Sequence, residues 1–172
     1  MYIRDLEIGD VDNLLEFELE NRDWFERFIT PRPDNFYAAA AVHEHIRAHL
    51  IAKQHGRFHG CVVLGVGGKI IARANLREIV VRQGLADIGY RVAKAHAGVG
   101  VASEATRHLM ALAYDEWNLK QLRGFAIVSN IASCRVLEKN GFIKVGIHAN
   151  SAKLRHGMYD CYEYRHEPSA AK

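Results

Sequence analysis

Apolar and polar positions along the chain follow two periods, and these divide it into alternating strands and helices. A period of two predicts β-strands, and a period near 3.6 predicts amphipathic helices. The helical period is clearest where Val101, Ala105, Leu109 and Leu112 recur on one face. The pattern predicts strands over residues 2–7, 58–66, 69–77, 87–93, 122–128, 142–148 and 158–166, and helices over 11–28, 36–54, 99–117 and 131–140.

Local signals support several of these boundaries. Asp10 is placed to cap the first helix, and Gly67 with Gly68 predicts a hairpin between two strands. Gly141 is expected to end the last helix. The order βααβββαβαββ indicates an α/β fold with a single mixed central sheet of about seven strands flanked by about four helices. Residues 1–172 are expected to form one domain.

Composition narrows the class of protein. The 172 residues are 49% apolar and 25% charged, which is typical of a folded globular protein. The formal charge of +3 is small, and the Lys and Arg residues are scattered among the acidic ones, so no nucleic-acid partner is expected. No apolar run reaches about twenty residues and no signal peptide is recognisable, so no membrane partner is expected. Cys61, Cys134 and Cys161 form no C-x-x-C pair and are expected to be reduced thiols, two of them buried, in a cytoplasmic protein.

A glycine turn between a strand and a helix is the first candidate site. Gly89 belongs to the strand before the turn, and Gly98 and Gly100 form the turn itself. Glycines let a backbone approach a phosphate, and the free N–H groups of a helix's first turn point at it. A dinucleotide fingerprint is absent because Ser103 stands at the third glycine position, and no P-loop sequence occurs. The pattern favours a phosphate-bearing cofactor, and a tight loop that only enters a helix is the alternative.

The residues around this turn resemble the GNAT superfamily of N-acetyltransferases. The acetyl-CoA motif of that family, Arg/Gln-x-x-Gly-x-Gly/Ala, corresponds to residues 95–100. The continuation over residues 101–105 and the later unit from Asn130 to Phe142 are similar to the RimJ/RimL-type branch of ribosomal-protein-alanine N-acetyltransferases. The resemblance covers nearly the whole chain. Ala95 replaces the usual Arg or Gln of the motif, which removes one side chain from the pyrophosphate site.

The resemblance implies the GNAT fold, with a sheet splayed between strands four and five, and acetyl-CoA as cofactor, released as CoA. The pantetheine arm then fills the gap between these strands, and backbone N–H groups of the glycine turn bind the pyrophosphate. Asn130 is expected to cap the following helix and to hold a pantetheine amide. The implied cofactor-binding residues are Tyr90, Arg91, Val92, His96, Ala97, Gly98, Val99, Gly100, Val101, Ala102, Asn130 and Ser133.

The reaction that the resemblance implies is direct attack of a neutral amine on the thioester carbonyl. The backbone N–H of Val92 is the expected donor to the oxyanion. Many relatives use a Tyr to protonate the leaving thiolate, but Leu137 stands at that position. Ser133 is therefore the candidate acid, and a small packing residue is its alternative role. Glu78 is the preferred base, with a water chain as the alternative; the other candidates are Asp87, Tyr90, His59 and Asp160.

The sequence leaves the acceptor amine open. An α-amino group, with a pKa of about 8, is partly neutral at pH 7. A lysine side-chain amine, with a pKa near 10.4, is almost fully protonated at pH 7 and depends more on a catalytic base. The absence of an obvious strong base therefore favours a peptide or protein N-terminus. A small amine, such as an amino sugar, polyamine, amino acid or toxin, is the second hypothesis. A CoA-binding sensor without catalysis is the third.

Three further expectations concern the rest of the chain. His45 and His49 have an i, i+4 spacing that can bind zinc, but a solvated helix face and no metal site are expected. The resemblance implies a homodimer through the sheet edge or the C-terminal strands, and residues 158–164 alternate as an edge strand does. The resemblance implies that the N-terminal helices form one wall of an acceptor groove, which aromatic residues there are expected to shape, with at least half of them in the core. They are Trp24, Phe25, Phe28 and Phe36.

Overall fold

The computed structural model describes residues 1–168, and its centre is a seven-stranded sheet in the order β1-β2-β3-β4-β5-β7-β6. β4 and β5 run parallel, and the other neighbouring pairs are antiparallel. This mixed sheet confirms the predicted fold class. The strands are β1 (Tyr2–Asp5), β2 (Phe58–Leu64), β3 (Ile70–Val80), β4 (Leu85–Val92), β5 (Gln121–Ile127), β6 (Ile143–Leu154) and β7 (Gly157–His166).

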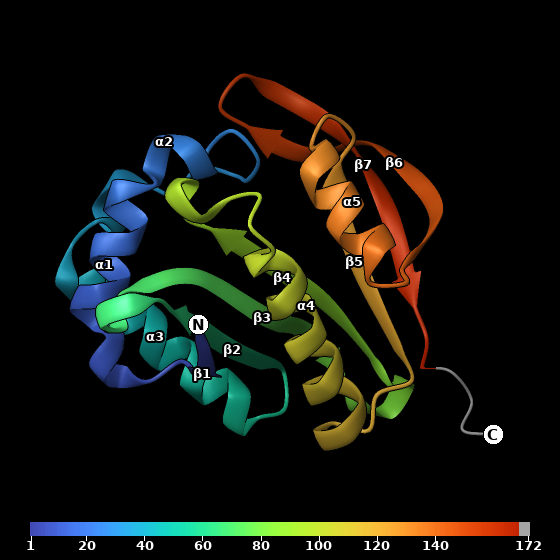
Figure 1. The fold of residues 1–172 in the computed structure, drawn as a ribbon, viewed down its shortest axis with the longest axis horizontal. Coiled ribbons are helices and arrows are strands. Elements are labelled where there is room, and N and C mark those ends of the chain that lie inside the picture. Colours follow the sequence, from blue (N-terminus) through green and yellow to red (C-terminus); the bar gives the residue numbers. More distant parts are fainter. Residues whose placement is uncertain (169–172) are drawn as a thin grey trace.

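Five α-helices flank this sheet, one more than expected (Figure 1). α4 and α5 pack on one face, and α1, α2 and α3 pack on the other face, over the half that contains β1 to β4. Within residues 1–168, no helix is both long and apolar enough to cross a membrane. The helices are α1 (Val11–Glu20), α2 (Arg22–Phe25), α3 (Ala39–Gln54), α4 (Val101–Ala111) and α5 (Ile131–Lys139).

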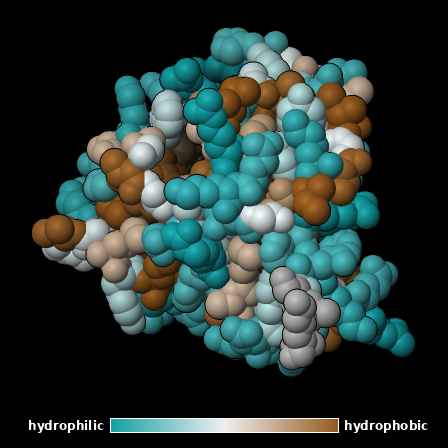
Figure 2. All heavy atoms as spheres, turned by 45° about the vertical axis from the view of Figure 1, so that its right-hand side comes forward, coloured by the Kyte–Doolittle hydropathy of each residue, from teal (hydrophilic) through white to brown (hydrophobic). Residues whose placement is uncertain are grey.

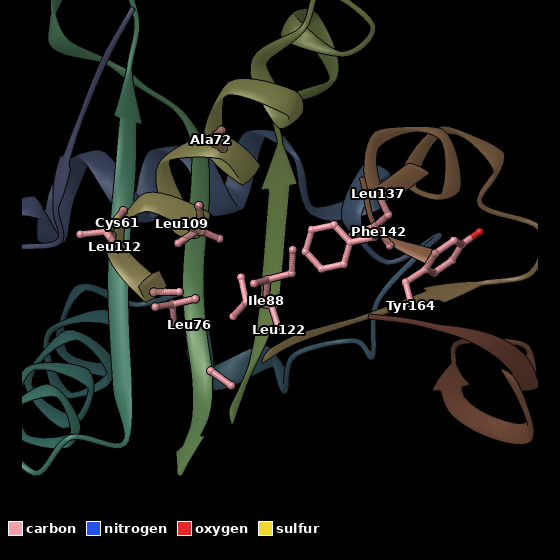
Figure 3. Close-up of a cluster of buried hydrophobic side chains, with 14 of the residues drawn as sticks. Cys61, Ala72, Leu76, Ile88, Leu109, Leu112, Leu122, Leu137, Phe142 and Tyr164 are labelled. Carbon is pink, nitrogen blue, oxygen red and sulfur yellow. The ribbon is translucent and has the colours of Figure 1, made fainter. Parts of the chain in front are cut away.

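Two apolar cores, one on each face of the sheet, hold these layers together. The larger core packs α4 and α5 against Leu76 of β3, Ile88 of β4 and Leu122 of β5 (Figure 3). Leu137 of α5 and Tyr164 of β7 extend it across the sheet. Each such side chain contributes about 1.5–3 kcal/mol when it is fully buried. The three cysteines are all buried, one more than expected.

The first predicted helix is interrupted at Asn21, which corrects the prediction of one helix over residues 11–28. The Asn21 amide donates to the Phe17 carbonyl at 2.9 Å, at the end of α1. Its Oδ1 accepts the backbone N–H of Lys94 at 2.9 Å, just beyond β4. A side chain that competes for backbone groups favours helix termination. α2 starts at Arg22 and ends at Phe25, so residues 26–28 lie in turns.

Other boundaries differ from the prediction by smaller amounts. α3 begins at Ala39, because Phe36 belongs to a separate short turn with its ring buried in the core. α4 ends at Ala111, and a wider π-helical turn completes the predicted segment. β6 continues to Leu154, well beyond the predicted end, because it pairs with β7 as far as Gly157.

Two predicted turns are confirmed. Gly141 follows α5 with a φ of +85°, and its N–H donates to the Glu138 carbonyl at 3.0 Å. The next N–H, of Phe142, donates to the Leu137 carbonyl at 3.1 Å. These two bonds form a Schellman motif, which satisfies carbonyls that a helix end leaves free. The hairpin between β2 and β3 closes through Gly67, whose φ of +73° is also left-handed.

The free edge at the β5 end of the sheet is β6 and not β7. β7 pairs with both β5 and β6, so the expectation that residues 158–164 form an edge is wrong. The alternation has another cause, because Tyr164 points at α5, where it donates to Glu138, while the other face of β7 carries no helix. Figure 2, in which the β6 side of the molecule is turned forward, shows separate apolar patches among hydrophilic side chains.

A buried carboxylate links the helices of one face to the sheet. Glu18 of α1 is 1% exposed and lies 3.1 Å from Arg73 of β3 and 3.0 Å from Arg91 of β4. Arg32 lies 3.4 Å from the same carboxylate. Burial alone would raise the pKa of Glu18, but the three guanidinium groups lower it below its ordinary value. One carboxylate therefore holds three cations from separate segments.

We expect Glu18→Gln to lower the free energy of unfolding by about 3–5 kcal/mol, because three guanidinium groups would lose the carboxylate that they share. Urea denaturation at pH 7 measures this loss. Because the folded pKa is lowered, the carboxylate's contribution should be complete above about pH 5 and decrease as pH falls. Glu16→Gln, which removes an exposed partner of Lys69 on the same helix, is the control. Equal losses in the two variants would contradict the prediction.

Candidate active site

β4 and β5 separate part-way along their length. Their parallel pairing ends at Ile88 and Gly124, although β4 continues to Val92 and β5 to Ile127. The two strands diverge beyond this point (Figure 1). The predicted splay between strands four and five is therefore confirmed, and a crevice of about 140 Å³ lies there.

Within residues 1–168, backbone groups at the end of β4 have no strand partner on the crevice side. The Ala93 N–H donates to the Ile71 carbonyl of β3 at 2.9 Å. Because backbone groups alternate along a strand, the N–H groups of Tyr90 and Val92 point away from β3 and toward the crevice. The Val92 carbonyl accepts the Trp24 indole N–H at 3.1 Å. The Val92 N–H therefore has the orientation that an oxyanion donor requires.

The crevice has two walls, because alternate residues of a strand face opposite sides of the sheet. On the side of α4 and α5, which we call the cofactor wall, the lining residues are Ile88, Tyr90, Gly124, Ser133 and Leu137. On the other side, which we call the acceptor wall, they are Ile29, Asn75, Arg77, Gly89, Arg91 and Phe125. Groups on either side can thus reach the same gap between β4 and β5.

The glycine turn after β4 has the left-handed conformations that its sequence predicts. Gly98 has a φ of +79° and Gly100 a φ of +92°, and no atom lies within 4 Å of a Cβ built on either. α4 starts at Val101, and the N–H groups of its first turn have no partner within the helix. The buried Nδ1 of His96 has no hydrogen-bond partner among the described residues. This open, donor-rich backbone fits a phosphate group.

Two hydroxyl groups meet on the cofactor wall. Asn130 caps α5, and its Oδ1 accepts the Ser133 N–H at 3.1 Å. The Ser133 Oγ lies 3.1 Å from the phenol oxygen of Tyr90, which also donates to the Ser133 carbonyl at 3.3 Å. Burial raises the pKa of Tyr90 to about 12, so the phenol keeps its proton at neutral pH. The sequence singled out Tyr90 for its backbone and as a candidate base, and missed it as a proton donor.

Leu137, at the position where many relatives have a Tyr, closes the cofactor wall. Its Cδ2 lies 2.8 Å from a Cβ built on Gly124, so only a glycine on β5 allows this close packing. Leu137 is buried and has no proton to donate. The hydroxyls that line this wall come from Tyr90 and Ser133 instead.

The structure does not bring Glu78 to the crevice. Glu78 is an exposed bulge residue of β3 with a φ of +49°, next to Arg77, which pairs with Asp87 near the start of β4. Asp87 is about 17 Å from Val92 along an extended strand. It is also bonded to Arg123 at 2.7 Å. Among residues 1–168, no carboxylate lines the crevice. A base role for Glu78 therefore has no support from its position.

His59, another candidate base, belongs to a separate cluster on β1 and β2. Its Nε2 lies 2.7 Å from Asp5, and its Nδ1 accepts the Trp117 indole N–H at 2.9 Å. Since an indole only donates, a neutral His59 carries its proton on Nε2, directed at Asp5. Cys61 also lies in this cluster, within 4.8 Å of the other two ligand atoms. The tautomer leaves no lone pair on Nε2 for a metal, so the cluster is a hydrogen-bond network.

His45 and His49 do not lie on a solvated helix face, which corrects the prediction. Their ring centroids are 4.0 Å apart, and His49 stacks on Phe58, also at 4.0 Å. Burial and the nearby positive charge of Arg73 lower the pKa of His45 to about 2 and that of His49 to about 3. Both imidazoles are therefore neutral near pH 7 and packed against the guanidinium cluster around Glu18.

Half of the four aromatic residues near the N-terminus lie in the core, as expected. Phe25 and Phe36 are buried in the core of their face. Trp24 and Phe28 remain partly exposed, with ring centroids 5.2 Å apart. Trp24 also holds the end of β4 through its bond to Val92. Of the N-terminal segment, Ile29, next to Phe28, is the residue that lines the crevice.

A family of acetyltransferases matches most of this chain. The family described as "Acetyltransferase (GNAT) domain" matches residues 1–143. The chain belongs to the GNAT acetyltransferase family. The Bacillus subtilis protein YjcK, described as a probable N-acetyltransferase, is 31% identical over 166 residues, which cover 95% of this chain and 91% of YjcK. Acetyl-CoA is the cofactor of GNAT enzymes and of this chain, and the open glycine turn and the crevice fit it.

Solved structures of GNAT enzymes share the fold of this chain. A ribosomal-protein-S5-alanine acetyltransferase from Vibrio fischeri aligns with a TM-score of 0.93 at 18% identity, covering 99% of this chain and 94% of that one. A RimL ribosomal L7/L12 α-N-protein acetyltransferase in complex with CoA aligns with a TM-score of 0.91 at 19% identity, covering 98% of this chain and 94% of that one. A spermidine N-acetyltransferase from Vibrio cholerae, in complex with CoA and spermine, aligns with a TM-score of 0.82 at 19% identity, covering 96% of this chain and 94% of that one. At such identities the likeness shows the fold alone.

Replacement of Asn130 separates its capping role from a role in cofactor binding. Asn130→Ala should lower the free energy of unfolding in urea by about 1 kcal/mol, because the Ser133 N–H loses its acceptor. Asn130→Asp keeps that acceptor and should keep the stability, but it loses the amide donor. If the amide binds pantetheine, calorimetry should show weaker CoA binding in both variants. Unchanged CoA binding in Asn130→Asp would contradict the cofactor role.

Proposed function

We propose that this GNAT acetyltransferase transfers the acetyl group of acetyl-CoA to the α-amine of a protein or peptide N-terminus by direct attack, as RimJ/RimL-type enzymes do. The observation that carries the proposal is the crevice through the sheet, whose lining has no carboxylate among residues 1–168. An α-amine, with a pKa of about 8, needs no strong base to become neutral. The fold shared with two ribosomal-protein acetyltransferases supports the same class of acceptor.

A small amine is the second candidate acceptor. The shared fold of a spermidine N-acetyltransferase favours it. The acceptor wall argues against a polyamine in particular, since its two charged side chains are Arg77 and Arg91. Like charges at close range repel one another, and more strongly where water is excluded. A peptide N-terminus therefore remains the preferred acceptor.

We assign the chemistry to groups that line the crevice. Acetyl-CoA supplies an activated thioester, so most of the acceleration comes from holding the two reactants together. The Val92 N–H is oriented to donate to the thioester oxygen, where negative charge develops. Ser133 and Tyr90 form the hydroxyl pair that donates a proton to the departing sulfur. Water carries away the proton of the amine.

Two further parts of the proposal concern assembly and location. A homodimer through the free edge strand β6 is supported by its exposed apolar side chains, Ile143, Val145 and Ile147. A molecular mass from scattering equal to that of one chain at tens of micromolar would rule out the homodimer.

A cytoplasmic location is supported by three cysteines that are free in the structure, as in a reducing compartment.

A thiol-release assay with two acceptor pools tests the acceptor class. One pool contains short peptides with free Ala, Ser or Met termini, and the other contains aminoglycosides, polyamines and amino acids. We expect turnover on the peptide pool, with kcat/KM rising about tenfold per pH unit until the α-amine is neutral, near pH 8. Turnover on the second pool alone would replace the peptide acceptor by a small amine. Failure of acetyl-CoA to bind in calorimetry would overturn the whole proposal.

Substitution of the two hydroxyl residues tests the proton donor. Ser133→Ala should lower kcat by roughly 100-fold, the lower end of general acid effects. Tyr90→Phe keeps the ring and removes only the phenol hydroxyl, so it should lower kcat similarly if the two hydroxyls act as a pair. Ser151→Ala, at an exposed hydroxyl on β6, is the matched control. Wild-type kcat in both active-site variants would exclude the pair as the acid.

A further inference from the structure

The acceptor wall is cationic. Its lining contains two charged side chains, Arg77 and Arg91, and no carboxylate among residues 1–168. Both residues have odd numbers on antiparallel neighbours β3 and β4, and they therefore face the same side of the sheet. An acceptor that approaches the gap between β4 and β5 from this side passes both guanidinium groups.

Arg91 belongs to a cluster with more cations than anions. It shares Glu18 with Arg73 and Arg32, so one carboxylate compensates three guanidinium groups. The Nε2 of His45 lies 3.3 Å from Arg73, and because this imidazole is neutral it adds no charge to the cluster. The cluster therefore keeps a surplus of positive charge next to the crevice.

The other carboxylates near the acceptor wall already have cationic partners. Asp87, two residues before Gly89 on the same face, is bonded to Arg123 at 2.7 Å. Glu163, which pairs with Phe125, is 2.7 Å from both His148 and Arg165. Glu26, near Ile29, accepts a hydrogen bond from Arg22 at 2.9 Å and lies 2.6 Å from Arg155. None of these three carboxylates forms a salt bridge with Arg77 or Arg91, although Asp87 is the cross-strand neighbour of Arg77.

Of the two charged side chains on this wall, Arg91 is paired with Glu18, and Arg77 has no carboxylate within salt-bridge distance in the part of the chain that the structure describes. It lies over Gly89, with Nε 3.9 Å from a Cβ built there, and the Asn75 amide oxygen lies 3.2 Å from the same point. Gly89 leaves the floor between them clear. A guanidinium without a carboxylate partner over an open floor matches a carboxylate, which Arg binds in a bidentate manner.

We propose that the acceptor carries a carboxylate close to its reacting amine, and that Arg77 binds this carboxylate. The inference rests on the proposed N-acetyltransferase function and narrows its substrate class. The carboxylate belongs either to an acidic side chain near a peptide N-terminus or to the α-carboxylate of a free amino acid. Polyamines, which carry several positive charges, are poor acceptors on this wall.

Matched acceptors that differ only in charge test the proposal. C-terminally amidated peptides beginning Ser-Glu and Ser-Gln compare a side-chain carboxylate with its neutral amide, and alanine compared with alaninamide does the same for an α-carboxylate. We expect kcat/KM to favour the carboxylate in one of these pairs by roughly 10-fold or more, as a charge-assisted hydrogen bond does. Spermidine should be acetylated more slowly than the preferred carboxylate acceptor.

Variants of Arg77 test its role directly. Arg77→Met keeps an unbranched side chain without charge, and should remove the preference through KM while CoA affinity stays unchanged. Arg77→Glu should reverse the preference in favour of a Ser-Lys peptide. Arg82→Met is the matched control, since Arg82 is exposed in the turn between β3 and β4 and does not line the crevice. Equal preferences in wild type and Arg77→Met would overturn the proposal.

A binding measurement separates this proposal from the proposed function. Calorimetric titration of the CoA-loaded protein with the acetylated Ser-Glu and Ser-Gln peptides, and with acetylated alanine and its amide, needs no turnover. Tighter binding of a carboxylate in wild type, lost in Arg77→Met, supports the proposal even if no acceptor is acetylated. Equal binding in both pairs overturns it, and so does fastest turnover on spermidine, although the enzyme would then still be an N-acetyltransferase.

Discussion

The separation of β4 from β5 is the constraint on which the whole site depends. A strand that loses its neighbour must satisfy its backbone groups elsewhere. The Trp24 indole N–H donates to the Val92 carbonyl, while the N–H groups of Tyr90 and Val92 point toward the crevice. Leu137 packs on Gly124 where the strands part, so α5 presents its first turn to the Tyr90 phenol. Backbone donors and hydroxyls meet here because two strands stop pairing.

Glu18 connects this geometry to the N-terminal half of the chain. Its carboxylate bonds α1 to β3 through Arg73 and to β4 through Arg91, one residue before Val92. Three guanidinium groups around one carboxylate would be unfavourable in a fully dry interior. They are tolerated because Arg91 borders the crevice, where water or a ligand reaches it. The same residues therefore stabilise the fold and set the sign of the charge on the acceptor wall.

The sequence predicted those parts of the fold whose signals are local. The seven strands, the hairpin at Gly67 and the end of α5 at Gly141 all depend on neighbouring residues, and all were found. The break at Asn21 was missed because its partner, the Lys94 N–H, is remote in sequence. The place of β7 inside the sheet was missed for a related reason. An alternating strand looks the same whether its second neighbour is solvent or β6, and only the long-range pairing distinguishes them.

The glycine turn and the acceptor wall differ in the same way. The glycine turn is recognisable in the sequence because left-handed glycines and a helix N-terminus offer phosphate-binding N–H groups from one continuous segment. The acceptor wall is assembled from β3, β4, β5 and the loop after α2, and no motif spans these elements. Its chemistry depends on pairing: Arg123 bonds Asp87, whereas Arg77 lies within salt-bridge distance of no carboxylate in the described chain, although the sequence makes the two arginines look alike. Charge that is left over after pairing is a property of the folded chain, and for this reason acceptor specificity has to be argued from the structure.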